Sequence, residues 1–315
     1  MRNLSDAQSG SGAVDQLSLR RANLAQVLRW LRDQGPRSRA RLATELGMTR
    51  SAVSSLVTEL VERGLVRTGG LERGGVGRPG TAVQLDGRTV CGIGAEVNVN
   101  HVSTMALDLA GNVVAEHRLS LDSNRLGARE VLDQLVSLVT ATEEDLARGG
   151  AATVGLTVGV AGLIDSADDV LTCAPNLAWR DVPVGAIVRD ALRPDYPVVI
   201  DNESNLAAMA ETLPGDPERQ DILVIFGEVG LGGGIVAEGR LLRGRQGYAG
   251  EFGHMIVDPQ GRRCGCGRVG CWETVAGLRA LLDAATDPDD PVRDPALGLQ
   301  ARLAEINRRA DLGDT

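Results

Sequence analysis

The 315-residue chain contains no lysine, so all 33 of its basic residues are arginine. Alanine, arginine and glycine are abundant along the whole sequence, which indicates a compositional bias as the source of the missing lysine. Aromatic residues make up only 2% of the chain, so its cores must be built from Leu, Val, Ile and Ala. Few aromatic side chains are left to stack on a sugar ring, and the candidates are Trp179, Tyr248 and Trp272.

The chain also lacks a long apolar run. No stretch is long enough to cross a bilayer, and the opening residues MRNLSDAQ are not followed by the apolar segment of a secretory signal. We therefore expect a cytoplasmic protein with no membrane partner. That location argues against structural disulfides.

The stretch from Gly250 to Thr274 gathers four good metal ligands. They lie within eighteen residues and are His254, Cys264, Cys266 and Cys271. Three thiolates and one imidazole complete a tetrahedral zinc shell with no open position, and the intervening glycines let the chain curl tightly. The alternatives are a pair of disulfides or unreacted thiols, but the ligand spacing favours structural zinc. The isolated Cys91 and Cys173 are interpreted as small buried hydrophobes.

Charge is distributed unevenly along the chain. Residues 17–80 hold 12 arginines against 5 acidic residues, whereas residues 81–315 hold 20 arginines against 35 acidic residues. The net charge of −9 conceals this asymmetry. A positive module attached to an acidic body is typical of a nucleic-acid-binding domain joined to an ordinary soluble domain.

The basic segment predicts a helix-turn-helix. Apolar residues at helical spacing mark a first helix, and they are Leu24, Val27, Leu28 and Leu31. This helix should end at the Gly35-Pro36 breaker, and a second short helix is expected from about Ser38 to Leu46, followed by a turn at Gly47. A third helix then carries an apolar stripe formed by Val53, Leu56, Val57, Leu60 and Val61.

The polar face of the third helix suits the major groove of DNA. It carries short hydroxyls and one arginine, namely Thr49, Arg50, Ser51, Ser54, Ser55 and Thr58. Two short strands, LVRTGG and TAVQL, then flank a glycine-rich loop in which Arg73 and Arg78 can approach a DNA backbone or minor groove. We therefore predict a winged helix-turn-helix at residues 17–86, preceded by a flexible arm at residues 1–16. The alternative is a small structural helical bundle with a solvated basic face.

From Thr89 the pattern changes to strands. The runs VCGIGAEV, HVSTMALDL and VVAEHRLSL are followed by a helical stretch from about Arg125 to Ala147 and by the strand TVGLTVGV. A second cycle has the strand VVI, a helix from about Asn202 to Glu211, and the strands ILVIF and GGIVAEG. We therefore predict an α/β fold in which residues 87–315 form two ribonuclease H-like, actin-like lobes around a ligand.

These features resemble the ROK family, which joins sugar-responsive repressors to sugar kinases. The resemblance extends from Leu17 to Leu282, and its most specific parts are the GHM opening and CGCGRVGCWE close of residues 250–274 and the GEVGLGGGI loop at residues 227–235. The winged domain resembles that of the repressor branch, where the wing motif GRP, here Gly77-Arg78-Pro79, is typical.

The resemblance implies roles for particular side chains. Zinc is held by His254 and the three clustered cysteines. Sugar hydroxyls are bound by carboxylates, an amide and the imidazole, namely Glu203, Glu251, Glu273, Asn202 and His254. Such groups supply the donors and acceptors that a polyhydroxylated ligand needs, and a zinc-pinned loop keeps them in place. For each carboxylate taken alone, the alternative is a solvated surface acid.

Three departures from active ROK kinases imply that kinase activity is lost. Those kinases have an Asp and a Gly-Gly-Thr phosphate turn where this chain has EVNVN at residues 96–100, and branched Val99 does not readily adopt the positive φ of such a turn. Glu203 stands where the kinases have the Asp that acts as catalytic base, as it commonly does in repressors of the xylose type, and its extra methylene displaces the carboxylate. The third departure is at the C-terminus. After a last helix from about Leu297 to Asp311, the segments that contact adenosine in relatives have no counterpart, so we expect a shortened chain with an incomplete second lobe.

We therefore predict a sugar-responsive repressor of carbohydrate utilisation genes, whose sugar effector closes the two lobes and changes the spacing of paired winged domains on operator DNA. This coupling requires a homodimer or homotetramer. One alternative is an ATP-dependent sugar kinase with an appended DNA-binding domain, in which the glycine-rich segment at residues 227–234 is a phosphate cradle and not a hinge. The other is a zinc-stabilised module that binds DNA without an effector.

Overall fold

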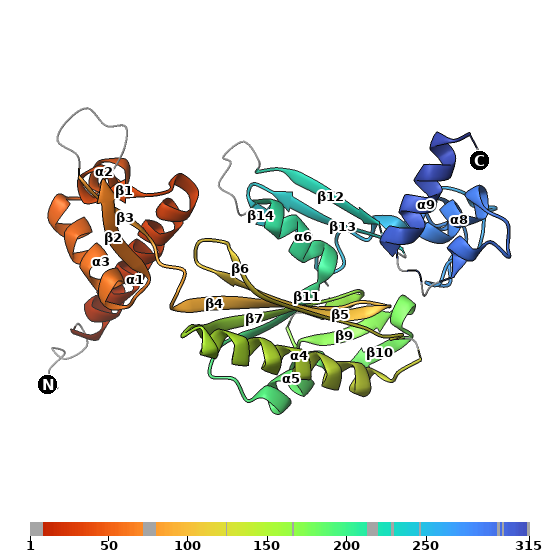
Figure 1. The fold of residues 1–315 in the computed structure, drawn as a ribbon, viewed down its shortest axis with the longest axis horizontal. Helices are drawn as coiled ribbons and strands as arrows, with labels where there is room; N and C mark the ends of the chain where they lie inside the picture. Colours follow the sequence, from red (N-terminus) through yellow and green to blue (C-terminus); the bar gives the residue numbers. More distant parts are fainter. Residues whose placement is uncertain are drawn as a thin grey trace, which may run out of the picture. The chain divides into compact units, whose positions relative to one another are not determined.

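The computed structural model has a mixed α/β fold (Figure 1). It describes residues 9–71, 80–123, 125–165, 167–212, 220–227, 230–245, 247–294, 297 and 299–313. No helix in these ranges combines the length and the apolar character that crossing a bilayer requires.

The N-terminal part folds as three helices and a small sheet. The helices are α1 (Ser9–Gln34), α2 (Arg39–Glu45) and α3 (Arg50–Glu62). The sheet has the order β1-β3-β2, with β1 (Arg37–Ser38), β2 (Val66–Leu71) and β3 (Thr81–Leu85). The predicted helix-turn-helix and the two strands of the wing are therefore confirmed. The wing loop at residues 72–79, with Arg73 and Arg78, lies outside the described residues.

Local signals set the ends of these helices. Ser38 and Thr49 are the N-caps of α2 and α3, and each hydroxyl accepts a hydrogen bond from a backbone N–H in the first turn. Gly35 follows α1 with a φ of +74° and Gly47 follows α2 with a φ of +64°. Glycine adopts this left-handed backbone without strain, so the helices end where the sequence predicted.

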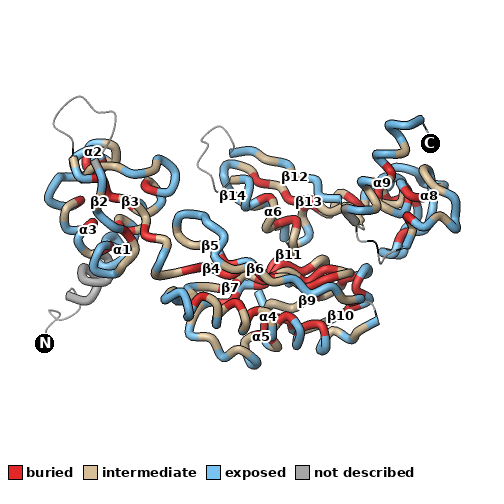
Figure 2. Tube along the Cα trace, viewed as in Figure 1, coloured by how far each residue is buried: buried red, intermediate tan, exposed pale blue. Residues whose placement is uncertain are grey.

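One apolar core holds the N-terminal part together, and Figure 2 shows its buried residues gathered inside this part. They come from all three helices and the sheet, and they are Leu24, Val27, Leu31, Leu42, Ala43, Val53, Leu56, Val57, Leu60, Val66 and Val83. The apolar stripe predicted for α3 is thus confirmed except at Val61, which is 39% exposed. Val61 lies about a quarter of a turn from the centre of the stripe, at its solvent edge.

Helix α1 extends into the segment predicted as an arm. The helix begins at Ser9, so residues 9–16 are helical. Once the buried part of α1 has nucleated, each further residue adds a backbone hydrogen bond, and residues 9–16 contain no proline that would remove a donor. Residues 1–8 lie outside the described residues.

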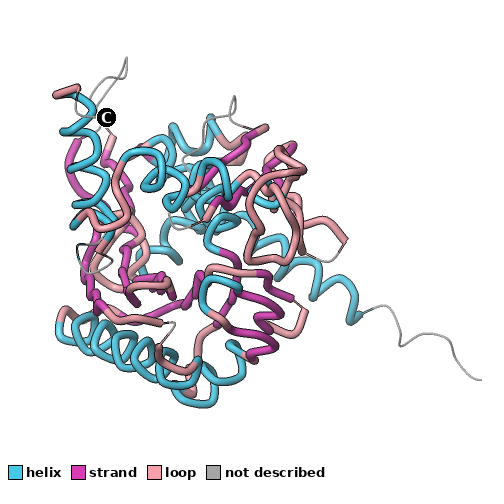
Figure 3. Tube along the Cα trace, turned by 90° about the vertical axis from the view of Figure 1, so that its right-hand side faces the viewer, coloured by secondary structure: helices cyan, strands magenta, loops and turns pink. Residues whose placement is uncertain are grey.

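A five-stranded sheet in the order β11-β7-β4-β5-β6 follows. Its strands are β4 (Val90–Val97), β5 (His101–Asp108), β6 (Val113–Ser120), β7 (Ala152–Val160) and β11 (Val198–Asn202). Helices α4 (Ala128–Arg148) and α5 (Val184–Leu192) cover one face of this sheet, as seen in both Figure 1 and Figure 3. The alternation of side chains in β4 fits this arrangement, because Cys91, Ile93 and Ala95 are buried whereas Gly92 and Gly94 are exposed.

Three short strands in this region were not predicted. They form an antiparallel sheet in the order β10-β9-β8, with β8 (Leu163–Asp165), β9 (Val170–Ala174) and β10 (Trp179–Val182). Runs of three to five residues are too short to show a clear alternation of apolar and polar side chains. A single 3₁₀ turn, η1 (Pro175–Leu177), joins β9 to β10.

The predicted second cycle is confirmed. Helix α6 (Glu203–Thr212) follows β11, and a second antiparallel sheet consists of β12 (Ile222–Gly227), β13 (Leu231–Ala237) and β14 (Arg240–Leu241). The glycine-rich segment is largely a strand, because Gly232, Gly233 and Gly234 pair with residues of β12. A Cβ atom on Gly234 would lie 2.5 Å from Ala208 Cβ and 2.6 Å from the Ser204 carbonyl oxygen. Gly232 and Gly234 therefore let α6 approach β13 closely, whereas Gly233 faces Phe252 of η2.

The last part of the chain is helical. It contains η2 (Phe252–His254), α7 (Glu273–Ala276), α8 (Leu278–Ala285), η3 (Pro291–Arg293) and α9 (Leu299–Asp311). A small apolar cluster of Leu282, Val292 and Ile306 joins α8, η3 and α9. The predicted last helix is confirmed within two residues.

Candidate functional sites

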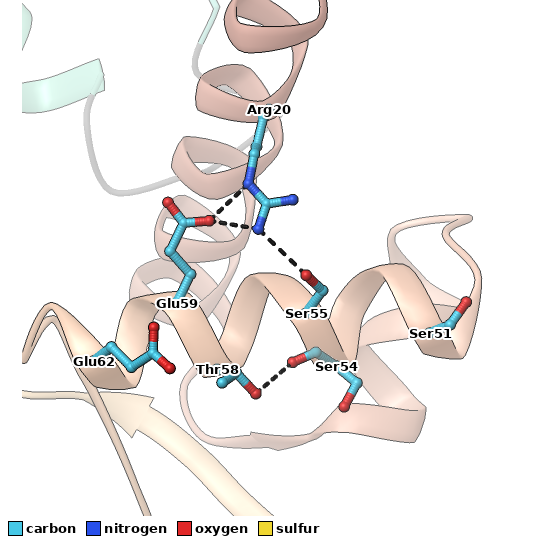
Figure 4. A pocket seen from close by; sticks show the side chains of 7 residues that line it. All are labelled: Arg20, Ser51, Ser54, Ser55, Thr58, Glu59 and Glu62. Atoms are coloured by element: carbon cyan, nitrogen blue, oxygen red, sulfur yellow. Dashed lines mark hydrogen bonds and ion pairs between the residues drawn. The ribbon is translucent and has the colours of Figure 1, made fainter.

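The residues predicted to read DNA lie at the start of α3. Thr49 is the N-cap and Arg50 is the first helical residue. Ser51, Ser54 and Ser55 line one open cavity of about 680 Å³ on the exposed face of this helix, shown in Figure 4. The N-terminus of a helix attracts anions through its free N–H groups and its dipole, so this end of α3 is suited to approach phosphate.

Three charged residues in the same cavity were not predicted. They are Arg20 from α1 and Glu59 and Glu62 from α3. The guanidinium of Arg20 donates from Nε to Glu59 Oε2 over 2.7 Å and from Nη2 to Ser55 Oγ over 3.2 Å. The hydrogen bond from Arg20 is the main cause that lowers the pKa of Glu59. Helical spacing could have revealed this contact, because Arg20 lies four residues before the buried Leu24 and so faces the same side of α1.

The four predicted zinc ligands come together. One ligand atom from each of His254, Cys264, Cys266 and Cys271 lies within 4.8 Å of all the others. The distance from Cys264 Sγ to His254 Nδ1 and that from Cys266 Sγ to Cys271 Sγ are both 3.6 Å. A tetrahedral zinc ion with bonds of about 2.3 Å to sulfur separates its ligands by roughly 3.7 Å. The donor set and its spacing therefore fit a metal ion.

The thiols of this cluster differ in their surroundings. Burial and a hydrogen bond to Glu273 raise the pKa of Cys264, whose Sγ lies 2.7 Å from Glu273 Oε1. Burial acts to raise the pKa of Cys266, but hydrogen bonds from the Arg268 backbone and from the other two thiols lower it overall. Cys266 is exposed whereas Cys264 and Cys271 are buried, so this knuckle lies at the protein surface.

All five predicted sugar-binding residues line a second cavity, of about 700 Å³. They are Asn202, Glu203, Glu251, His254 and Glu273. Two of the three aromatic candidates, Trp179 and Tyr248, also line it. Its lining includes polar side chains that were not predicted, among them Asn98, Asn176, Arg180 and Arg268. Only their convergence in three dimensions identifies these four, because they lie far apart in the sequence.

The junction of β11 and α6 holds Asn202 and Glu203 in place. Asn202 Oδ1 accepts hydrogen bonds from the backbone N–H groups of Ser204 and Asn205, and its Nδ2 donates to the Gly162 carbonyl oxygen over 3.0 Å. The preceding Asp201 is only 2% exposed and pairs with both terminal nitrogens of Arg243, which belongs to the segment after β14. The side chains that open α6 are therefore fixed on both sides.

His254 can serve both sites at once. Its Nδ1 faces Cys264 in the metal cluster, while its Nε2 lies 3.7 Å from Glu251 Oε2. Burial, and to a smaller extent the neighbouring Glu273, raise the pKa of Glu251. One imidazole ring thus links the metal cluster to a carboxylate of the cavity.

The turn at residues 96–100 uses its own hydrogen-bonding groups. The N–H of Asn98 donates to the His101 carbonyl oxygen over 2.9 Å, and the N–H of Val99 donates to Asn98 Oδ1 over 2.6 Å. The hydrogen bond with His101 lowers the pKa of Glu96, as does that from Asn98, against the effect of burial. A phosphate cradle needs free backbone N–H groups, and these two are occupied.

Two family models match the chain. The model described as ROK family matches residues 92–314, and the model described as MarR family matches residues 24–75. The xylose repressor of Bacillus subtilis is 30% identical over 270 residues, an alignment that covers 85% of this chain and 69% of the repressor.

Solved structures of a regulator and of a kinase are also similar to this chain. The crystal structure of a ROK family transcriptional regulator, a homologue of the E. coli MLC protein, has a TM-score of 0.67 and 26% identity, and the match covers 85% of this chain and 67% of that one. A ROK family glucokinase from Streptomyces griseus, solved with glucose and AMPPNP, has a TM-score of 0.58 and 29% identity over 71% of this chain and 72% of the kinase. The match to the regulator thus covers more of this chain than the match to the kinase does.

Proposed function

The chain belongs to the ROK family and carries a MarR-type winged helix domain, and from this we propose that it is a sugar-responsive repressor of transcription that binds operator DNA. A relative across most of the chain is a xylose repressor, and a solved relative of similar extent is a transcriptional regulator. The basic balance of residues 17–80 supports attraction to phosphate, and the exposed hydroxyls of α3 support approach to a major groove.

The effector is proposed to bind in the 700 Å³ cavity. The observation that carries this assignment is the convergence there of Asn202, Glu203, Glu251, His254 and Glu273, which come from separate elements. Carboxylate, amide and imidazole groups can bind the hydroxyls of a sugar by accepting and donating hydrogen bonds. Trp179 and Tyr248 add apolar surface of the kind on which a sugar ring packs.

Zinc is proposed as the structural metal, held by His254, Cys264, Cys266 and Cys271. When bound there, zinc would cross-link η2, which ends at His254, to the loop that precedes α7. That cross-link supports the cavity, because His254 contributes to both sites and Glu273 follows Cys271 by two residues.

Loss of kinase activity is the finer part of this proposal. The occupied N–H groups of Asn98 and Val99 and the presence of Glu203 in place of an aspartate both disfavour phosphoryl transfer. The alternative, a sugar kinase with an appended DNA-binding domain, is supported by the similarity to a glucokinase solved with glucose and AMPPNP.

Two assays separate these alternatives. The protein is incubated with Mg-ATP and a panel of pentoses and hexoses that begins with xylose, and ADP release is compared with that of Glu203→Ala. We expect no turnover above this control, while at least one sugar raises the melting temperature of the wild-type protein but not that of Asn202→Ala. Turnover that depends on Glu203 would establish the kinase instead, and a melting temperature that no sugar changes would remove the effector cavity from the proposal.

Regulation by an effector also needs symmetry. Operators with two half-sites require two recognition helices about 34 Å apart or a multiple of this distance, so we propose a homodimer or homotetramer. A sugar that binds one arrangement of the subunits more tightly than another then shifts operator occupancy.

A further inference from the structure

Arg20 reaches from α1 to the exposed face of α3. Figure 4 shows its side chain directed at Glu59 and Ser55, while Ser54 and Thr58 lie on the opposite edge of the helix in this view. All of these residues, together with Ser51, line the same open cavity. Two of its nitrogens, Nε and Nη2, donate to Glu59 Oε2 and thereby fix the plane of the guanidinium. The side chain is nevertheless 46% exposed. Arg20 is therefore both held in position and open to a ligand.

Arg20, which lines the cavity, keeps donors that no described group uses. Nη2 also donates to Ser55 Oγ, and in the described part of the chain Nη1 has no hydrogen-bond partner. A guanidinium carries five N–H donors, of which three are occupied here. The Ser55 hydroxyl beside it can itself donate to an acceptor. An incoming oxygen acceptor would thus meet Nη1 and a hydroxyl side by side.

Arg20 also offsets negative charge on this face of α3. Along α3 the only cation near the N-terminus is Arg50, whereas the later turns carry Glu59 and Glu62. Two acidic side chains facing DNA would repel its phosphates. Arg20 and Arg63 both form ion pairs with Glu59, so the negative charge of Glu59 is offset.

We propose that Arg20 binds a DNA phosphate at the edge of the groove that α3 enters, and that Glu59 is the positioning residue that holds its guanidinium. This inference rests on the proposed function, because it assumes that the winged domain binds DNA. It adds to the interface a residue of α1 that belongs to neither the recognition helix nor the wing.

The geometry favours a phosphate over a base. Recognition of guanine by arginine uses two parallel donors directed at O6 and N7. Arg20 has two such pairs of donors. The pair Nε and Nη2 is bound to Glu59, and the pair Nη1 and Nη2 is incomplete because Nη2 also donates to Ser55. The single nitrogen left suits one phosphate oxygen, which carries no sequence information.

The test measures DNA binding as a function of salt. Wild-type protein, Arg20→Ala, Arg20→Lys and Arg29→Ala are titrated by fluorescence anisotropy against a duplex from the promoter next to the gene and against an unrelated duplex. Arg29 is the matched control because it lies on the same helix, has the same charge and bonds to the Ala25 carbonyl oxygen. Melting curves of all four proteins establish that each is folded.

We expect Arg20→Ala to weaken binding to both duplexes by a similar factor. The slope of log K against log salt concentration should become shallower by about 0.9, the value for one lost phosphate contact on B-form DNA. Arg20→Lys keeps the charge and should restore most of the slope, and Arg29→Ala should match the wild type.

Three results would overturn this assignment. An Arg20→Ala variant with wild-type affinity and slope would show that Arg20 does not meet DNA. A loss confined to the promoter duplex would mean that Arg20 reads a base. If the wild-type protein bound neither duplex, the proposed function itself would fail. The first two results would overturn only the role of Arg20 and would leave the proposed function intact.

Glu59→Gln tests the positioning role separately. If Glu59 only repelled DNA, removing its charge would tighten binding at every salt concentration. We expect weaker binding, because Arg20 loses the carboxylate that orients it. Unchanged or tighter binding by Glu59→Gln would contradict the role given to this residue.

Discussion

At the residue scale, the metal cluster is the part of the site that the sequence predicted best. Four ligands within eighteen residues, separated by glycines, leave few other arrangements, and the structure brings all four within 4.8 Å. Arg20 was missed because its contact joins two residues that are 35 positions apart in the sequence, and helical spacing indicates only which side of α1 it faces. Asn98 and Asn176 were missed for the same reason.

Zinc binding can be tested at Cys266, which is exposed, so that its replacement removes little packing. We expect Cys266→Ser to lose bound zinc, as measured by plasma mass spectrometry, and to melt at a lower temperature. Structural zinc contributes roughly 10–16 kcal/mol in small zinc domains, so the loss of one thiolate should cost several kcal/mol here. A chelator should lower the melting temperature of the wild-type protein but hardly affect the variant.

The control for this variant is Cys173→Ser, which makes the same change outside the cluster. Its zinc content should equal that of the wild type. Zinc retained by Cys266→Ser with unchanged melting would show that the cluster does not hold a structural metal.

At the scale of elements, long periodic segments were predicted well and short ones were not. Helices α1, α3 and α4 and strands β4 to β7 follow the predicted order, because each is long enough for its apolar residues to repeat. Strands β8 to β10 escaped prediction because they are short. Strand β13 shows a further limit of sequence-based prediction, since Gly232 and Gly234 are explained by close contact with α6 and not by any local turn.

The close contact between α6 and β13 can be tested with Gly234→Ala. Its new methyl group would meet Ala208 Cβ and the Ser204 backbone, so we expect a loss of about 1–3 kcal/mol in the free energy of unfolding. The change also presses on the start of α6 and should weaken effector binding. Urea denaturation followed by circular dichroism measures the first effect.

Gly92→Ala provides the matched control, because Gly92 also lies in a strand but no atom lies within 4 Å of the position of a Cβ. It should be neutral or stabilising by up to about 1 kcal/mol, since alanine restricts the unfolded chain. Equal losses in both variants would mean that strand geometry, and not contact with α6, requires glycine.

At the scale of the whole molecule, we propose a DNA-binding domain joined to a sugar-binding domain. The sequence predicted both, because the charge asymmetry, the period of the apolar residues and the family motifs each point to one of them. The chain spans 69% of the Bacillus subtilis xylose repressor and 67% of the solved regulator. A coupling free energy of about 1–3 kcal/mol between the two sites, typical of allosteric proteins, is enough for regulation.

The proposed function is tested most directly by titrating the promoter duplex next to the gene with purified protein, alone and with each sugar of a panel, at several salt concentrations. We expect binding that weakens as salt increases, and one sugar that changes the affinity by about 5-fold or more. A protein that binds the duplex equally with and without every sugar, or that does not bind it at all, would contradict the proposed function.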